Sequence, residues 1–173
     1  DAVGARDKDS EKQRMRKAIN SIVDGVGILQ QLKMGALIVF ERKTKLGDII
    51  ETGTQINCEP SGQIVGNIFF NKAPLHDGAL IIRNERLYAA GCFLPLSTNP
   101  DIVKDLGTRH RAGIGMSENS DAVVLIVSEE TGVISVAVDG VLKRGFSKKT
   151  LEAYLSDLLI DEQKSKPSAR FRI

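Results

Sequence analysis

The hydrophobic positions of this chain follow a helical spacing at both ends and form strand-like runs between them. Over residues 7–32, apolar side chains recur every three or four residues, at Met15, Ile19, Ile22, Val23, Val26 and Leu29. The same spacing returns near the C-terminus, at Leu151, Tyr154, Leu155, Leu158 and Leu159. Because this period is typical of one buried helix face, we predict an amphipathic helix at each end, the second one capped by Ser147.

Between these helices, short apolar runs bounded by glycine, proline or charge predict buried strands. The runs cover residues 36–40, 79–82, 87–94, 122–127 and 133–138, with shorter strands ending at 58 and covering 141–143. Asp139-Gly140 predicts a tight hairpin turn. Short helices are predicted at residues 47–50, 60–69, 100–106 and 108–116. This mixture of strands and helices indicates an α/β protein.

Glycines and one threonine mark the expected weak points and ends of the helices. Gly25 and Gly27 should weaken the second half of the first helix, at about 1 kcal/mol each relative to alanine. Gly35 is a stop signal for that helix. Thr108 is expected to cap the helix that follows it, which would place Arg109 in the first turn, where anions are held.

The bulk composition is that of one globular domain. The chain has 173 residues, 42% of them hydrophobic and 27% charged, which suits a single core. The net charge of +2 is too small to indicate a nucleic-acid or membrane surface. Cys58 and Cys92 stand far apart, so neither a zinc site nor a disulfide framework is indicated. No stretch approaches the roughly 18 apolar residues of a membrane span, and no signal peptide is recognisable.

The two histidines of the chain lie in two short motifs that combine charge with glycine. The motifs are Leu75-His76-Asp77-Gly78-Ala79 and Gly107-Thr108-Arg109-His110-Arg111. In the first, an imidazole beside a carboxylate can hold a divalent metal, and the glycine lets a ligand approach the backbone. In the second, two guanidiniums and the N–H groups of a helix start can hold a polyphosphate. A metal and a triphosphate together indicate nucleotidyl transfer.

Further segments place these motifs in a recognisable context. They are Gly35-Ala36-Leu37, Glu41-Arg42, Ile50-Glu51-Thr52-Gly53, Phe93-Leu94-Pro95-Leu96-Ser97 and Ser128-Glu129-Glu130-Thr131-Gly132. With the two histidine motifs, they resemble the diadenylate cyclase (DAC) domain over residues 34–159, and most of all its membrane-anchored CdaA-type branch. The resemblance implies a single α/β domain with a central mixed β-sheet flanked by helices. It also implies condensation of two ATP into cyclic di-AMP, with release of two pyrophosphates.

The resemblance assigns roles to individual residues. The implied catalytic residues are Asp77, Arg109 and Glu130, and the implied metal ligands are His76, Asp77 and Glu130. The implied nucleotide-binding residues are Gly78, Ala79, Leu94, Gly107, Thr108, Arg109, Arg111, Ser128 and Glu129. For Arg111 and Glu129 it stays open whether they touch the nucleotide or only support their neighbours, and His110 is a candidate structural residue. The implied cofactor is a divalent metal, Mn²⁺, Co²⁺ or Mg²⁺, of which imidazole suits the first two at least as well as the third.

The resemblance also implies how the domain is bounded and assembled. We expect residues 1–33 to form a leader with the amphipathic helix, residues 34–160 the catalytic domain, and residues 161–173 a polar flexible tail. Two protomers, each bringing one ATP, would meet face to face because the product is two-fold symmetric. The domain would be cytoplasmic, with the full-length protein anchored in the cell membrane by N-terminal helices outside this chain. No nucleic-acid partner is expected.

Taken one at a time, these residues also have ordinary structural explanations. His76 can be a hydrogen-bonded loop histidine, Asp77 a turn former, and Arg109 part of a solvated helix face. A catalytically silent ATP sensor is the alternative function, but it would lose an acid, whereas Asp77 and Glu130 are both present. A cyclase that acts on a nucleotide with another base is a second alternative, which stays open because backbone groups are expected to recognise adenine.

Overall fold

The computed structural model describes residues 2–102, 104 and 106–161, and its centre is one seven-stranded sheet. The strands are β1 (Ala36–Phe40), β2 (Thr54–Cys58), β3 (Ala79–Arg83), β4 (Arg86–Cys92), β5 (Val123–Val127), β6 (Ile134–Val138) and β7 (Val141–Arg144). Their order across the sheet is β2-β4-β3-β1-β5-β6-β7. β1 and β3 are parallel, and every other neighbouring pair is antiparallel. The predicted mixed sheet is therefore confirmed.

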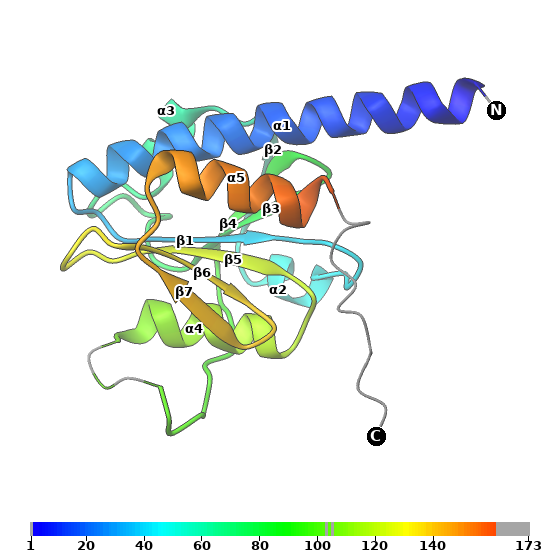
Figure 1. Ribbon diagram of the computed structural model, residues 1–173. Coiled ribbons are helices and arrows are strands. Elements are labelled where there is room, and N and C mark those ends of the chain that lie inside the picture. The colour runs from blue at the N-terminus through cyan, green and yellow to red at the C-terminus, as the bar shows by residue number, and fades with distance from the viewer. Residues whose placement is uncertain (1, 103, 105, 162–173) are drawn as a thin grey trace, which may run out of the picture.

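Helices cover both faces of this sheet (Figure 1). They are α1 (Ala2–Gln31), α2 (Gly47–Glu51), α3 (Gly62–Ile68), α4 (Thr108–Glu118) and α5 (Lys148–Leu159). The side chains of α1, α3 and α5 share one hydrophobic cluster with one face of the sheet. Those of α2 and α4 share a second cluster with the other face. All five side chains of β1 are buried, because this strand has a layer of helices on each side.

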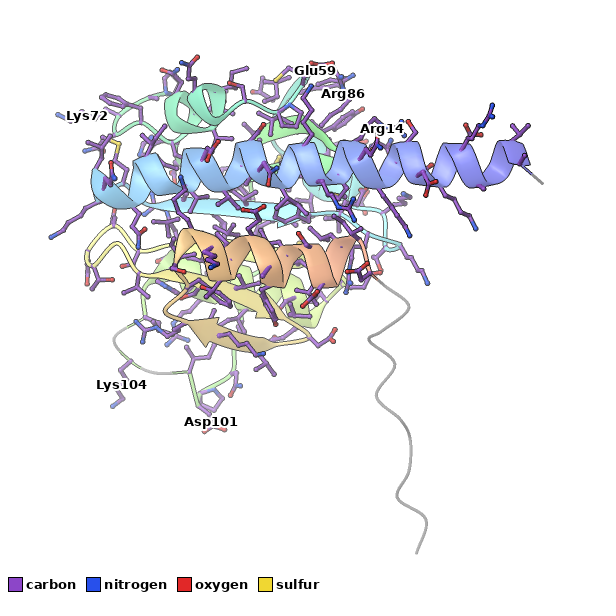
Figure 2. All side chains as sticks on the ribbon, turned by 45° about the horizontal axis from the view of Figure 1, so that its top comes forward. Arg14, Glu59, Lys72, Arg86, Asp101 and Lys104 are labelled. Atoms are coloured by element: carbon purple, nitrogen blue, oxygen red, sulfur yellow. The ribbon has the colours of Figure 1, made fainter. Side chains whose placement is uncertain are left out.

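Helix α1 belongs to the core along its second half only. Its residues Ile19, Ile22, Val26 and Leu29 are fully buried in the first hydrophobic cluster, as the periodicity predicted. The first half projects past the edge of the sheet (Figure 1). Its side chains are exposed to solvent, apart from the partly buried Met15 (Figure 2). Within the part of the chain that the structure describes, no helix combines the length and the apolar character that a membrane crossing requires.

Gly25 and Gly27, in the second half of α1, are contact points between helices. A Cβ atom on Gly25 would lie 2.7 Å from the Cβ of Val65 in α3, and one on Gly27 would lie 2.8 Å from the Cδ of Lys148 in α5. A side chain at position 25 would therefore push against Val65 and the backbone of α3, whereas one at position 27 would displace the Lys148 side chain. The predicted weak half of α1 is thus the half that lies against two other helices.

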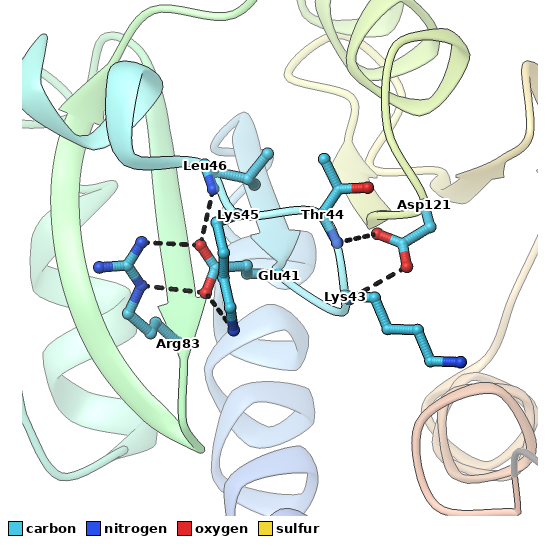
Figure 3. Close-up of polar contacts among 7 residues, drawn as sticks. All are labelled: Glu41, Lys43, Thr44, Lys45, Leu46, Arg83 and Asp121. Carbon is cyan, nitrogen blue, oxygen red and sulfur yellow. Dashed lines mark hydrogen bonds and ion pairs between the residues drawn. The ribbon is translucent and has the colours of Figure 1, made fainter.

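A polar cluster fixes the loop that leaves β1 (Figure 3). The Glu41 carboxylate accepts hydrogen bonds of 2.9 Å from both Nε and Nη2 of Arg83 and one of 2.8 Å from the N–H of Leu46. Burial alone would raise the pKa of Glu41, but the bonds from Arg83 and Leu46 and the nearby positive charge lower it overall. On the other side of the loop, Asp121 accepts from the N–H groups of Lys43 and Thr44, both at 3.0 Å. Within the Glu41-Arg42 segment, Glu41 therefore has a structural role.

Two predicted segments differ from the structure or lie outside it. The helix expected at 100–106 is not formed over Pro100–Ile102, which form a turn and a bend, and Val103 and Asp105 lie outside the described residues. In this segment the backbone N–H of Asp101 donates to Oδ1 of Asn99 at 2.9 Å, so a local turn uses a donor that a helix would need. The tail predicted at 161–173 lies outside the described residues from 162 onward.

Candidate functional site

A cavity of about 760 Å³ opens at the edge of the sheet where β1 and β3 begin and β4 and β5 end. Loops and the first turn of α4 complete its walls. Its lining residues are Leu37, His76, Asp77, Gly78, Cys92, Phe93, Leu94, Leu96, Gly107, Thr108, Arg109, His110, Ala112, Val127, Ser128, Glu129 and Glu130. The two histidine motifs, separate in the sequence, therefore face one space.

The N-terminus of α4 forms one wall of the cavity. Gly107 has an extended backbone and is the N-cap residue, and the first helical hydrogen bond runs from the N–H of Arg111 to the Gly107 carbonyl. Thr108 is consequently the first helical residue, and the prediction that it caps the helix was wrong. The backbone N–H groups of the first turn have no partner within the helix and can bind an anion in the cavity.

Arg109 projects from this first turn and is held at two points. Its Nη1 lies 3.1 Å from Oε2 of Glu129, which follows β5. Its guanidinium also lies against Gly35, immediately before β1, where a Cβ atom would be only 2.3 Å from Nη1. The Arg109 side chain is 25% exposed and that of Glu129 66% exposed. The guanidinium is therefore positioned by contacts while part of it stays open to the cavity.

The opposite wall carries His76 and Asp77, in the loop that enters β3. Nδ1 of His76 lies 2.6 Å from the carbonyl oxygen of Ala73. A carbonyl oxygen can only accept, so Nδ1 carries the proton and Nε2 keeps its lone pair for a ligand. Gly78 has a φ of +105°, and a Cβ there would lie 2.8 Å from the Cys92 carbonyl oxygen. Glycine is thus required where the chain turns from His76 and Asp77 into β3.

The donor set fits a divalent metal only in part. An imidazole Nε2 and an adjacent carboxylate suit Mn²⁺, Co²⁺ or Mg²⁺, and the imidazole nitrogen favours Co²⁺ over Mn²⁺ and both over Mg²⁺. Among the described residues, however, no three side chains of the His, Cys, Asp or Glu type come close enough together to hold an ion. The predicted trio of His76, Asp77 and Glu130 lines one cavity but is not assembled as a ligand cluster. An ion bound by His76 and Asp77 would therefore need further ligands.

The remaining wall is apolar and was largely missed by sequence reasoning. Phe93 and Leu96, which flank the predicted Leu94, are 66% and 54% exposed. The N–H of Phe93 donates to the Thr52 hydroxyl at 2.9 Å, which fixes this segment over the cavity. Behind it, burial raises the pKa of the Cys92 thiol to about 11, so the thiol is unreactive at neutral pH. Exposed large apolar residues beside a polar cavity are suited to the face of a planar ring.

His110 lines the cavity from the buried side of α4. The residue is 6% exposed and its Nε2 has no hydrogen-bond partner among the described residues. Burial lowers the pKa of His110, and the charges of Arg144 and Arg109 lower it further. The imidazole is therefore neutral at pH 7 and adds no charge to the N-terminal end of the helix.

The structure brings most of the predicted site residues together. His76, Asp77, Gly78, Leu94, Gly107, Thr108, Arg109, Ser128, Glu129 and Glu130 all line the cavity. Ala79 and Arg111 do not. Ala79 is fully buried in the cluster beneath α4, and the carbonyl of Arg111 accepts from the N–H of Ser97 at 2.9 Å. Their membership of the two family motifs made both residues candidates, but neither is among the residues that line the cavity.

Comparison with known proteins identifies the family. The family model described as DAC, DisA bacterial checkpoint controller nucleotide-binding, matches residues 23–142. The chain belongs to the DAC family. The predicted membership is thereby confirmed, and the match includes the end of α1 and every strand up to the start of β7.

Curated relatives of this DAC domain carry names that describe an activity. "Cyclic di-AMP synthase CdaA" of Bacillus subtilis is 44% identical over 144 residues, which is 83% of this chain and 53% of the relative. "Diadenylate cyclase" of Listeria monocytogenes is 43% identical over 150 residues, 87% of this chain and 55% of the relative. The chain thus spans about half the length of these relatives.

Solved structures confirm the DAC fold. A crystal structure of a double mutant of DacA from Staphylococcus aureus has a TM-score of 0.74 and 44% identity, covering 88% of this chain and 97% of that one. A "hypothetical membrane spanning protein" from Bacillus cereus has a TM-score of 0.71 and 42% identity, covering 73% of this chain and 62% of that one.

Proposed function

We propose that this domain is a diadenylate cyclase, which condenses two ATP into cyclic di-AMP and releases two pyrophosphates. One observation carries the proposal: a single cavity joins the free N–H groups of α4 and Arg109, the His76–Asp77 pair, and an apolar wall. These are the partners that the phosphates, a divalent metal and a purine ring require. The names of the curated relatives support the same activity.

The reaction balances as two identical substitutions. The 3′-oxygen of one ATP attacks the α-phosphorus of the other, a P–O bond to the departing pyrophosphate breaks, and the hydroxyl proton leaves to a base. The same step in the reverse direction closes the ring. In this proposal Asp77 accepts or directs the proton of the attacking hydroxyl. Arg109 and the first turn of α4 stabilise the negative charge that develops on the phosphates.

The metal and the remaining polar residues have the following proposed places. Nε2 of His76 and the carboxylate of Asp77 would hold a divalent ion, with phosphate oxygens and Glu130 as further ligands. When bound, the ion would neutralise charge on the triphosphate and polarise the α-phosphate. Ser128 and Thr108 would donate hydrogen bonds to phosphate oxygens, and the backbone around Leu94 would recognise adenine.

Assembly and location belong to the same proposal. A cavity of about 760 Å³ holds one ATP but not a second one in the reverse orientation, so two protomers would meet with their cavities facing. The B. cereus neighbour, described as membrane spanning, supports a longer protein that is anchored in the membrane with this domain in the cytoplasm.

The decisive experiment identifies the product. The protein is incubated with ATP, and separately with GTP, in the presence of Mn²⁺. The products are then separated and identified by mass spectrometry. Cyclic di-AMP from ATP alone supports the proposal, whereas a cyclic product from GTP at a comparable rate would reassign the base. Intact ATP bound without product would instead support the sensor function.

A further inference from the structure

We propose that Gly35 is a positioning residue for nucleotide binding, because its missing side chain leaves the slot in which the Arg109 guanidinium lies. The inference rests on the proposed function, since it assumes that Arg109 binds the phosphates of ATP. It assigns a role to a residue outside the cavity lining and outside both histidine motifs.

The slot is defined by three short distances. A Cβ atom on Gly35 would lie 2.3 Å from Nη1 of Arg109, 2.5 Å from Cζ and 2.9 Å from Nε. All three atoms belong to the guanidinium plane, so the whole group lies against the backbone of Gly35. Real Cβ contacts do not come this close, and an alanine here would displace the guanidinium.

The requirement for glycine at this position concerns space and not backbone conformation. Gly35 is buried and, unlike Gly78 and Gly132, it does not adopt a positive φ. An alanine can therefore adopt its backbone without strain. The three heavy atoms nearest to the new Cβ all belong to the end of a long, flexible side chain, that of Arg109. Moving Arg109 relieves these closest contacts, so we expect the main cost to fall on Arg109.

The slot also explains how Arg109 is aimed. The guanidinium is fixed by Gly35, and its Nη1 is further held by the carboxylate of Glu129 at 3.1 Å. Gly35 ends the connection from α1 to β1, and Glu129 follows β5, the antiparallel neighbour of β1. Two adjacent strands of the sheet thus hold one guanidinium beside the free N–H groups of α4. A fixed guanidinium binds phosphate with less loss of side-chain entropy than a mobile one.

A double-mutant cycle tests the proposal. The variants are Gly35→Ala, Arg109→Ala and the double variant, and the ligand is 3′-deoxyATP, which lacks the attacking hydroxyl and binds without being converted. Gly35→Ala should raise the Kd measured by calorimetry by about tenfold, the loss expected for one charge-assisted hydrogen bond. In the Arg109→Ala background the same substitution should change the Kd less than about twofold, because no guanidinium remains to be displaced.

Two glycines serve as matched controls. Gly47 has no atom within 4 Å of an added Cβ, so Gly47→Ala should leave the Kd unchanged. Gly25→Ala places a Cβ 2.7 Å from Val65, so it should lower the melting temperature, and Arg109→Ala should not relieve that loss. These controls separate an effect on Arg109 from a general effect of adding a methyl group.

Each outcome decides the proposal. A Kd for Gly35→Ala within twofold of the unmodified protein would overturn it, as would equal effects of Gly35→Ala with and without Arg109. If Gly35→Ala does not fold, recovery of folding in the double variant supports the slot, and failure of the double variant overturns it. Failure of the unmodified protein to bind 3′-deoxyATP at all would refute the proposed function itself, which is a separate result.

Discussion

Nδ1 of His76 donates a hydrogen bond to the carbonyl oxygen of Ala73 across 2.6 Å. This contact fixes the tautomer, and it leaves Nε2 as the nitrogen that can bind a metal. The proposed role of His76 as a metal ligand can therefore be tested at one nitrogen.

Replacing His76 by alanine should lower activity and change the order of metals. With Mn²⁺ and Co²⁺ the loss should be larger than with Mg²⁺, because imidazole nitrogen favours the first two. Initial rates of cyclic di-AMP formation with each metal, at matched concentrations, provide the comparison. The same metal order in the variant and the unmodified protein would leave His76 with a structural role only.

Asp77→Asn should abolish turnover and leave the fold intact. The substitution keeps the shape of the side chain but removes the charge that, in the proposed mechanism, binds the metal and receives the proton. Product formation and circular dichroism should be measured on the same preparation. Asp157→Asn, at an exposed position of α5, is the control for the loss of one surface charge. Near-normal turnover in folded Asp77→Asn would exclude this residue from the chemistry.

Arg109→Ala should weaken nucleotide binding and slow the reaction. It removes a charge-assisted contact worth roughly 1.5–3 kcal/mol, which corresponds to about 10- to 150-fold in affinity. Calorimetry with 3′-deoxyATP and initial rates with ATP give the two numbers. Arg16→Ala, exposed on the projecting half of α1, is the matched control. If Arg109→Ala changed both quantities less than about twofold, Arg109 would belong to a solvated helix face.

Glu41 should make stability depend on pH. Its pKa is lowered in the folded protein, so its ion pair with Arg83 stabilises the fold fully above the ordinary glutamate pKa of about 4.3. That stabilisation is lost as the pH falls through the lowered folded value. Glu41→Gln should therefore reduce the free energy of unfolding by about 2–3 kcal/mol at pH 7, with a smaller difference from the unmodified protein in acid.

Urea denaturation at pH 7 and at acid pH measures this difference. Glu152→Gln, at an exposed position of α5, should leave the free energy of unfolding unchanged at both values. If the difference in free energy of unfolding between Glu41→Gln and the unmodified protein stayed constant with pH, the contribution of Glu41 would come from its shape and not from its charge.

Activity should depend on assembly. If two facing protomers make the product, the initial rate should rise with about the square of enzyme concentration below the dimer dissociation constant, because only dimers turn over. A dilution series with light scattering at the same concentrations tests this. A strictly linear rate from a species shown to be a monomer would rule out the paired-site mechanism.

The local elements could be predicted from the sequence because local chemistry decides them. Asp139 and Gly140 form the predicted hairpin turn with φ values of 50° and 78°, and Ser147 caps α5 through the N–H of Thr150. The burial of β1 likewise follows from its uninterrupted apolar run. Each of these depends on residues within a few positions of one another.

What the sequence did not predict depends on distant neighbours. Gly25 and Gly27 were interpreted as weaknesses, because a pattern cannot show that α3 and α5 lie against them. Gly35 was interpreted as a stop signal and as part of a family segment, and neither interpretation placed Arg109 beside it. The apolar wall at Phe93 could have been expected, since a large hydrophobic residue adjoins the predicted Leu94. The sheet order, with β1 between β3 and β5, has no local signal at all.

The central position of β1 has a consequence for the order in which the protein can be made. Both strands that pair with β1 come later in the chain, and β5 ends at Val127. Until Val127 has been synthesised and has left the ribosome, β1 cannot pair with β5. The five apolar side chains of Ala36–Phe40 are then only partly buried, and one edge of the strand is unpaired. Because the His76 and Arg109 walls meet only across the completed sheet, a chain shortened before Val127 would contain both motifs and have no cavity.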